Sequence, residues 1–195
     1  GFLQCLGFGE FKLSGTTRKY LILNPYCEKD LRQKLGELHY PLNDAWRDSV
    51  LRWIWQVASA LAQCHKQQLL HKDVKPENIL LDANGNAYLI DFGISRTTAS
   101  ISVAKKYTRE YCAPEQIKGK SLMASDLFAL TMVFHELLTG KRAIIEPRKV
   151  RLDLALPKQF QSLVFSSLNP DPVKRLAGVA EEEKLAEFLK QLAAL

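Results

Sequence analysis

Three short motifs in this chain of 195 residues carry side chains that could perform chemistry. The motifs are His71-Lys72-Asp73-Val74-Lys75-Pro76-Glu77-Asn78, Asp91-Phe92-Gly93 and Ala113-Pro114-Glu115. Transfer of a phosphoryl group needs a carboxylate to orient the attacking hydroxyl, a cation beside the moving phosphate and two oxygen ligands for magnesium. The motifs supply all of these groups in one ordered set, so they indicate phosphoryl transfer.

The first motif contains the candidate catalytic base. Asp73 could accept the proton of the attacking hydroxyl, although a lone aspartate in a loop is more often a turn former or a helix cap. Its neighbours favour the catalytic role, because Lys75 could neutralise charge on the transferred phosphate. The alternative for Lys75 is an ordinary surface lysine.

Asn78 and Asp91 are the candidate ligands for Mg²⁺. They offer one neutral and one anionic oxygen, and magnesium uses few protein ligands because it keeps waters and phosphate oxygens. Between them, residues 79–90 contain two apolar runs separated by the turn sequence Asp82-Ala83-Asn84-Gly85-Asn86. A hairpin is therefore predicted there, and it would bring Asn78 and Asp91 to one place.

The spacing of apolar residues predicts the helices that position these motifs. Over residues 44–66, with Asp44 as the cap, apolar residues recur at steps of three and four. A second helix, beginning at Ser125 or Asp126, is apolar on nearly all sides and should be central, with Gly140 as its left-handed cap. Amphipathic stretches follow Pro157 and the acidic run at 181–183.

The start of the chain has a different pattern. Residues 2–11 and 20–23 read as two strands joined by turn formers at 14–17, and Pro25 ends the second strand. With 47% hydrophobic and 25% charged residues, the chain is expected to form one ordinary domain. The predicted fold class is α+β, predominantly helical.

Charge and cysteine content limit the cellular setting. The net charge is +6, but the sequence has no arginine-rich run and no interleaved aromatic residues. We therefore expect a solvated basic surface and do not expect a nucleic-acid partner. No apolar stretch reaches the roughly 20 residues that span a bilayer, and neither a signal peptide nor a membrane role is expected. Cys5, Cys27, Cys64 and Cys112 lack metal or redox spacing, which indicates reduced thiols and a cytoplasmic location.

Together the three motifs resemble those of the eukaryotic-like serine/threonine protein kinase family. The resemblance implies a kinase-like large lobe over residues 30–195, a hinge at 25–29 and remnant small-lobe strands at 1–24. It implies ATP and Mg²⁺ as cofactors, with the nucleotide held by the residues of a hinge and one apolar contact. These residues are Pro25, Tyr26, Cys27 and Leu80.

The same resemblance implies a protein substrate with a serine or threonine acceptor. Thr108 matches the threonine that contacts the catalytic base, and Asp126 matches a buried aspartate that holds the catalytic loop. Glu115 and Arg175 match a buried ion pair. Six basic residues surround the segment that would receive a peptide, and they could favour acidic substrates. These residues are Arg96, Lys105, Lys106, Arg109, Lys118 and Lys120.

The chain also departs from the family pattern. No strand lysine or helix glutamate fits before Pro25, and Lys12 stands where a glycine-rich loop would have its third glycine. A partner chain or a missing segment would then complete the small lobe. The alternative is a kinase-like interaction module that lacks a complete ATP site. The stretch between Gly140 and Pro157 is also short for the family's substrate-docking helix.

Overall fold

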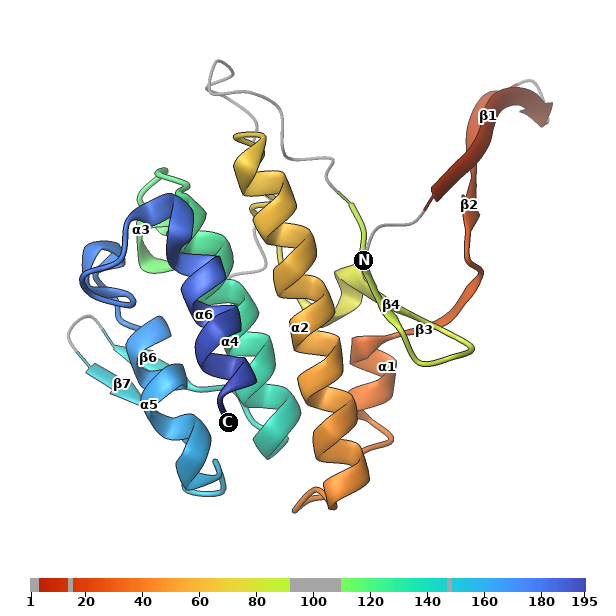
Figure 1. The fold of residues 1–195 in the computed structure, drawn as a ribbon. Helices are drawn as coiled ribbons and strands as arrows, with labels where there is room; N and C mark the ends of the chain where they lie inside the picture. Colours follow the sequence, from red (N-terminus) through yellow and green to blue (C-terminus); the bar gives the residue numbers. More distant parts are fainter. Residues whose placement is uncertain (1–3, 14–15, 92–109, 147–148) are drawn as a thin grey trace.

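A computed structural model describes residues 4–13, 16–91, 110–146 and 149–195 as a mostly helical body from which one hairpin projects (Figure 1). Its α-helices are α1 (Leu31–Leu35), α2 (Asp44–Lys66), α3 (Pro114–Ile117), α4 (Met123–Thr139), α5 (Lys158–Ser167) and α6 (Lys184–Ala193). Short 3-10 helices lie at η1 (Pro76–Asn78), η2 (Pro172–Lys174) and η3 (Glu181–Glu183). The predominantly helical α+β class is confirmed.

The strands form small antiparallel sheets. They are β1 (Gln4–Leu13), β2 (Thr16–Asn24), β3 (Cys27–Asp30), β4 (Ile79–Asp82), β5 (Ala87–Leu89), β6 (Ile144–Glu146) and β7 (Lys149–Arg151). Strand β1 pairs with β2, β3 pairs with β4 and β4 with β5, and β6 pairs with β7. In the first sheet Phe8 lies opposite Leu21, so the hairpin predicted at the start of the chain is confirmed for its described residues.

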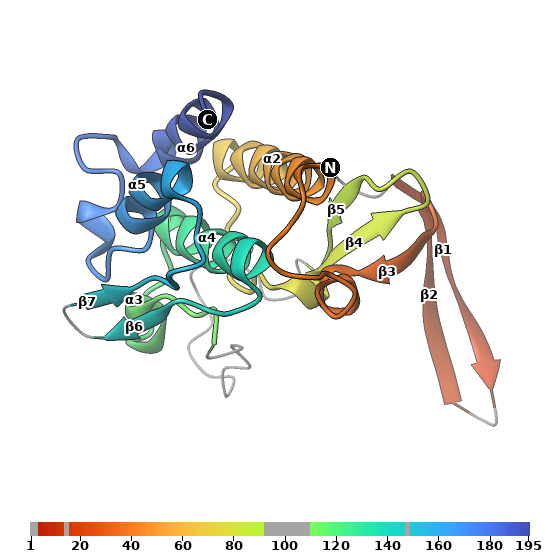
Figure 2. The ribbon, with the colours of Figure 1, turned by 90° about the horizontal axis from the view of Figure 1, so that it is seen from below.

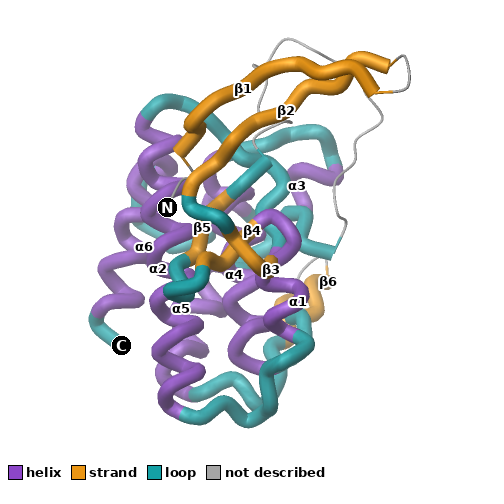
Figure 3. The backbone as a smooth tube through the Cα atoms, turned by 90° about the vertical axis from the view of Figure 1, so that its right-hand side faces the viewer, coloured by secondary structure: helices purple, strands orange, loops and turns teal. Residues whose placement is uncertain are grey.

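The β1–β2 hairpin extends away from the helices as a separate arm. Figure 2 shows it on the opposite side of the molecule from β6 and β7, and Figure 3 views the molecule from the side on which the hairpin projects. A two-stranded sheet by itself is marginally stable in water. The segment expected to be a hinge forms β3 from Cys27 onward, and Cys27 and Asp30 lie opposite Asp82 and Leu80 of β4.

Helix α2 has the predicted apolar face and a different cap. The side chain of Asn43 accepts a hydrogen bond from the backbone N–H of Trp46 at 2.9 Å, so Asn43 is the N-cap and Asp44 is the first helical residue. The expectation that Asp44 caps the helix was wrong by one position, since both residue types suit a cap. The buried face predicted from periodicity is confirmed; it comprises Val50, Ile54, Val57, Leu61 and Cys64.

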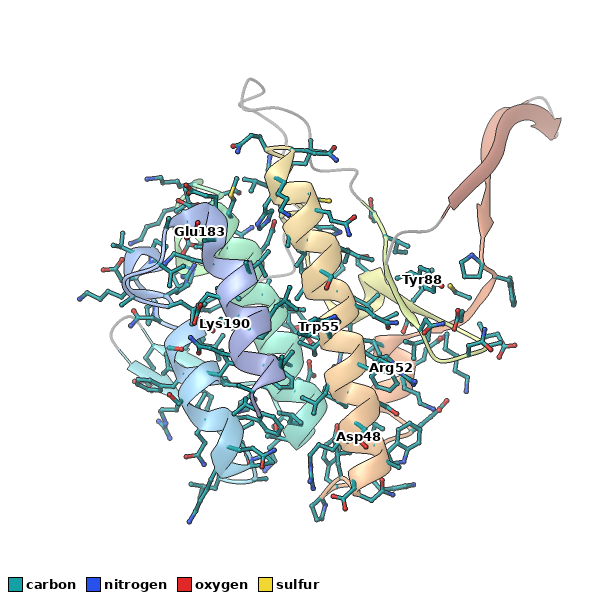
Figure 4. All side chains as sticks on the ribbon, viewed as in Figure 1. Asp48, Arg52, Trp55, Tyr88, Glu183 and Lys190 are labelled. Atoms are coloured by element: carbon teal, nitrogen blue, oxygen red, sulfur yellow. The ribbon has the colours of Figure 1, made fainter. Side chains whose placement is uncertain are left out.

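The opposite face of α2 meets solvent. Asp48, Arg52 and Trp55 lie on its outer side in Figure 4, and all three are exposed. Among the helices of the described residues, none has the length and hydropathy that crossing a bilayer would require.

Helix α4 is the centre of the core. It begins at Met123, two residues before the earliest expected start, and every residue from Ala124 to Thr139 is buried. It packs against α2, α5 and α6, and the Phe134 ring makes edge contacts with Phe160 of α5 at 5.5 Å and Phe188 of α6 at 6.4 Å between ring centroids. The prediction of a central, fully buried helix is confirmed.

The short β6–β7 hairpin occupies the stretch between α4 and α5, and His135 of α4 holds its two ends. The His135 ring is fully buried, with Nδ1 2.8 Å from the Lys141 carbonyl and Nε2 3.0 Å from the Asp153 backbone nitrogen. A carbonyl can only accept and an N–H can only donate, so the ring must be neutral with its proton on Nδ1. His135 thus closes the loop that carries β6 and β7.

Gly140 allows the first stability prediction. Its φ is +74°, and a Cβ atom there would lie 2.8 Å from Cε2 of Tyr40. We expect Gly140→Ala to lower the free energy of unfolding by about 1–2 kcal/mol for the left-handed backbone and by about 1–3 kcal/mol more for the steric overlap. Urea denaturation measures the loss.

Gly178→Ala is the matched control for this prediction. Gly178 also has a positive φ of +85°, but a Cβ atom there would meet nothing within 4 Å. It should therefore show the backbone cost alone, about 1–2 kcal/mol. Equal losses in the two variants would contradict the proposed contact between Tyr40 and a side chain at position 140.

His135 allows a prediction about pH. Burial lowers the pKa of the His135 imidazole, and this outweighs the opposing effects of the Lys141 carbonyl and the carboxylates of Asp153 and Glu136. Below about pH 6.5 the unfolded state binds a proton that the folded state excludes. Stability should therefore be full above that pH and fall on acidification, by at most about 1.4 kcal/mol per pH unit.

The measurement is the urea midpoint of the protein and of His135→Gln between pH 7.5 and 5.5. The variant should be less stable at the upper pH but should have a flatter pH dependence, because the titrating ring is gone. His39→Gln, a change at an exposed histidine, should keep the slope of the unaltered protein. A slope unchanged in His135→Gln would refute the assignment of the acid sensitivity to this ring.

Candidate active site

The loop that carries the first motif is held by a buried carboxylate of α4. Asp126 is 1% exposed, and its two oxygens accept hydrogen bonds from the backbone N–H groups of His71 at 2.9 Å and Lys72 at 2.8 Å. The ring nitrogen Nε2 of His65 in α2 is also 2.9 Å from Asp126. A buried carboxylate needs such partners. The loop therefore stabilises Asp126 in the core, and Asp126 in turn holds the loop in place.

Lys72 adopts a backbone conformation that needs this support. Its φ is +73°, in the left-handed region that costs a residue with a side chain about 1–2 kcal/mol. Asp126 binds its N–H, and Nε2 of Gln116 in α3 donates to its carbonyl at 3.0 Å. The turn just before Asp73 is therefore fixed from two sides, by α4 and by α3.

Asp73, Lys75 and Asn78 meet in the same loop. The Lys75 ammonium donates to Oδ2 of Asp73 at 2.7 Å. The Asn78 amide nitrogen donates to the Asp73 carbonyl at 2.8 Å and lies 3.3 Å from Oδ2. The Asp73 side chain is 10% exposed. Three of the residues singled out in the sequence are thus in direct contact.

Ile90 connects Asp91 to this loop. Its N–H donates to the Asn78 carbonyl at 2.9 Å, and its carbonyl lies 2.9 Å from Nε2 of His71. Because Asp91 directly follows Ile90, it must lie beside Asn78. The predicted β4–β5 hairpin is confirmed, with Ile79 opposite Leu89, and it provides this juxtaposition.

Asp91 is exposed and has a φ of +65°. A non-glycine residue in this region is strained, and such strain is frequent at functional sites because the surrounding structure has to maintain it. The strain at Asp91 is consistent with a carboxylate that is held toward a ligand.

The two candidate metal ligands fit a magnesium ion chemically. Nδ2 of Asn78 is the donor to Asp73, so the Asn78 amide oxygen is the atom available to a cation. Asp91 adds a carboxylate on the adjacent strand end. One or two oxygen side chains together with phosphate and water oxygens form the usual environment of Mg²⁺.

The residues expected to hold a nucleotide lie along β3 and β4. Leu80 is half-buried and pairs with Asp30 of β3 and Tyr88 of β5. Tyr26 is 80% exposed, and Cys27 begins β3. Pro25 contributes its carbonyl to a contact with the Cys27 thiol. The pairing of β3 with β4 places this segment alongside Leu80.

Thr108 lies outside the described residues, as do Arg96, Lys105, Lys106 and Arg109 of the basic group. The chain is described again from Glu110. Tyr111 and Cys112 line a small cavity of about 10 Å³ together with Asp73, so these two residues lie beside the candidate base.

Glu115 and Arg175 form the buried ion pair that the resemblance implied. Two guanidinium nitrogens donate to the two carboxylate oxygens at 2.6 and 2.8 Å, and Ser125 of α4 donates to the same carboxylate at 2.6 Å. Burial by itself raises the pKa of Glu115, but the hydrogen bonds from Arg175 and Ser125 outweigh it and lower the pKa. The pair fixes α3 to the α4 terminus.

A second charged cluster was missed in the sequence. Arg32 of α1 donates to Glu77 at 2.9 Å and to Glu136 of α4 at 3.0 Å, and it also contacts the Tyr111 hydroxyl, which donates to Glu136. Burial raises the pKa of Tyr111 and the Glu136 bond adds to this. The sequence did contain one sign of this cluster. Glu136 lies inside a mostly apolar helix, and a buried glutamate requires a polar or charged partner.

Comparison with known sequences adds an independent line of support. A sequence profile described as "Protein kinase domain" matches residues 11–193. The Aurora kinase of Patiria pectinifera is 36% identical over 190 residues, which cover 90% of this chain and 46% of that protein. The Aurora kinase of Saccharomyces cerevisiae is 32% identical over 173 residues, covering 82% of this chain and 46% of that protein.

A plant protein is similar as well. Serine/threonine-protein kinase AtPK2/AtPK19 of Arabidopsis thaliana is 31% identical over 155 residues, which cover 70% of this chain and 32% of that protein. The chain spans less than half the length of each of these relatives. The profile covers nearly the whole sequence, and the loop geometry agrees with the motifs. The chain therefore belongs to the protein kinase family.

Proposed function

We propose that this protein transfers the γ-phosphoryl group of ATP to a serine or threonine hydroxyl of a protein. The main support for the proposal is the position of Ile90, the residue before Asp91. Its backbone is hydrogen-bonded to Asn78 through the N–H and to His71 through the carbonyl. Through it the carboxylate of Asp73, the amide of Asn78 and the carboxylate of Asp91 share one small region. These are the groups that phosphoryl transfer requires.

Asp73 is proposed as the base that orients the acceptor hydroxyl and accepts its proton. Its contacts with Lys75 and Asn78 prevent free rotation of the carboxylate, so the group is preorganised. The Lys75 ammonium lies 2.7 Å from Asp73 and would offset the negative charge of the phosphoryl group. Asn78 and Asp91 would hold Mg²⁺, whose charge neutralises and orients the phosphates when it is bound.

The nucleotide base is proposed to lie along β3. Backbone groups of Pro25, Tyr26 and Cys27 would bind the adenine edge, and Leu80 would form an apolar contact with its face. The pairing of β3 with β4 supports this arrangement, because it holds the two segments at a fixed separation of about 5 Å. Thr108 is proposed to contact Asp73 from the acceptor side.

The β1–β2 arm is the proposed attachment site for the rest of a small lobe. A two-stranded sheet buries too little apolar surface to be stable alone, so further strands or another chain should pack on it. Those elements could come from another segment of the same protein or from a partner. We expect a soluble, cytoplasmic protein. Among the cysteines with described side chains, Cys27, Cys64 and Cys112, none forms a disulfide.

The central prediction concerns Asp73. Asp73→Asn keeps the shape of the side chain but removes the proton acceptor, so incorporation of labelled phosphate from ATP into a generic protein substrate should fall by at least about 100-fold. Asp48→Asn, the same change at an exposed position on α2, should retain full activity. Equal incorporation by the protein and by Asp73→Asn would refute the assignment of the base.

Binding of the nucleotide can be tested without catalysis. ATP with Mg²⁺ at about 100 times its dissociation constant should stabilise the fold by about 2.7 kcal/mol, which is a rise in melting temperature of roughly 5–10 °C for a chain of this size. Asp91→Ala and the addition of EDTA should each remove most of the shift. Asp48→Ala is the control that should retain it.

An absent shift in the unaltered protein would contradict the proposed nucleotide site. That result would favour the alternative role, a kinase-like module that binds another protein. A shift that persists in Asp91→Ala and in EDTA would show nucleotide binding without the proposed metal ligands.

A further inference from the structure

The peptide group between Lys72 and Asp73 is contacted at both of its polar atoms, and the two contacts come from different parts of the chain. Nε2 of Gln116 in α3 donates to the carbonyl at 3.0 Å. The N–H, which belongs to Asp73, lies 3.4 Å from Nδ1 of His71. A peptide group is planar, so contacts at both polar atoms fix the direction in which the chain enters Asp73.

The N–H end of this peptide group belongs to the site described above. An N–H can only donate, so Nδ1 of His71 accepts, and the ring carries its proton on Nε2, which donates to the Ile90 carbonyl. His71 thus connects the entry into Asp73 with the entry into Asp91. The carbonyl end is different, because its partner Gln116 lies 44 residues later in the chain than Lys72 and outside the three motifs.

The Gln116 amide can hold the carbonyl because its own orientation is fixed. Its Oε1 accepts the backbone N–H of Ala113 at 3.0 Å, which leaves Nε2 turned toward Lys72. The side chain is 2% exposed, and a buried amide that loses a partner is costly. The buried pair of Glu115 with Arg175 anchors the residue next to it. Gln116 is therefore a firmly placed hydrogen-bond donor.

The backbone of Lys72 shows why this donor is needed. Its φ is +73°, in a region that residues with a side chain rarely occupy. Asp126 accepts the Lys72 N–H and so holds the peptide group before Lys72, whereas Gln116 holds the peptide group after it. Only the second of these peptide groups adjoins Asp73. A change of the Lys72 backbone to an ordinary conformation would break the Gln116 bond and reorient Asp73.

We propose that Gln116 is a positioning residue for the catalytic base. It holds the peptide group that leads into Asp73, and through it the carboxylate, in the orientation that accepts a proton. This role rests on the proposed kinase activity, because it requires that Asp73 is the base. Both bonds of the Gln116 amide go to backbone groups of the protein itself, so its loss should lower kcat and leave KM unchanged.

Gln116→Met is the first test, because methionine has a similar length and no amide. The kcat for phosphate transfer to a protein substrate should fall at least about tenfold, and the KM values of ATP and of the substrate should stay within about twofold. Gln161→Met is the matched control. Nε2 of Gln161 in α5 also donates to a backbone carbonyl, that of Leu156 at 3.1 Å, and this variant should keep full kcat. Urea denaturation gives the folded fraction to which each kcat is referred.

Gln116→Glu separates the hydrogen bond from packing, because it keeps the shape of the side chain. The introduced carboxyl can donate to the Lys72 carbonyl only when it is protonated. Burial and the carboxylate of Asp73 would raise its pKa above the usual value of about 4.3, and the Lys72 ammonium would oppose this. The kcat relative to the unaltered protein should therefore be lowest at pH 8.5 and rise at least about threefold on acidification to pH 5.5.

The ratio of the two kcat values is the quantity to compare, because other groups titrate nearby. Those of the loop, of α4 and of the segment that ends in α3 are Lys72, Asp73, Asp126, Tyr111, Cys112 and Glu115. They are present in both proteins, so the ratio cancels their own titration. For Gln116→Met the same ratio should be constant with pH, because methionine does not titrate.

Three results would overturn the proposal. Gln116→Met could keep its kcat, or its defect could appear as a raised KM, which would make Gln116 a substrate-binding residue. The relative kcat of Gln116→Glu could also be equal at pH 5.5 and 8.5, in which case the loss comes from packing.

Hydrogen exchange tests the holding of the loop without catalysis. The backbone amides of Lys72 and Asp73 should exchange at least about tenfold faster in Gln116→Met than in the unaltered protein or in Gln161→Met. Unchanged exchange would refute the holding role, whether or not the protein is a kinase. Faster exchange in a protein that transfers no phosphate would contradict the kinase proposal and still show that Gln116 holds the loop.

Discussion

The candidate site depends on one buried carboxylate. Asp126 is on the central helix and accepts the N–H groups of His71 and Lys72, which precede Asp73 in the loop. These bonds, together with the one from Gln116, stabilise the left-handed backbone of Lys72. The carboxylate in turn is tolerable inside the core because the loop and His65 satisfy its oxygens. The same hydrogen bonds therefore position the loop that carries Asp73 and satisfy a buried carboxylate of the core.

Helix α4 combines two roles for the same reason. An entirely apolar helix could form the core, but it could not orient a loop. Asp126, His135 and Glu136 interrupt its apolar surface. Each is hydrogen-bonded to a different surrounding segment: the loop that carries the first motif, the β6–β7 connection and Arg32 of α1. Because unpaired polar groups in the core are costly, each bond requires its partner segment to occupy one position.

Helix α3 links the loop to the far side of the body. The Glu115–Arg175 pair anchors it, Gln116 donates a hydrogen bond to Lys72, and Ile117 borders a groove between α3, α4 and β6.

The sequence alone determined the chemical groups and the elements that are governed by local rules. The motif side chains, the buried helix with its Gly140 cap, the α2 face and the β4–β5 hairpin all follow from residue type and short-range spacing. The tertiary structure decided the contacts between residues far apart in the chain, such as Arg32 with Glu136 and Lys72 with Asp126. It also decided the groove between α3, α4 and β6. Three separate elements form this groove, and neither periodicity nor turn chemistry predicts which side chains will share a surface.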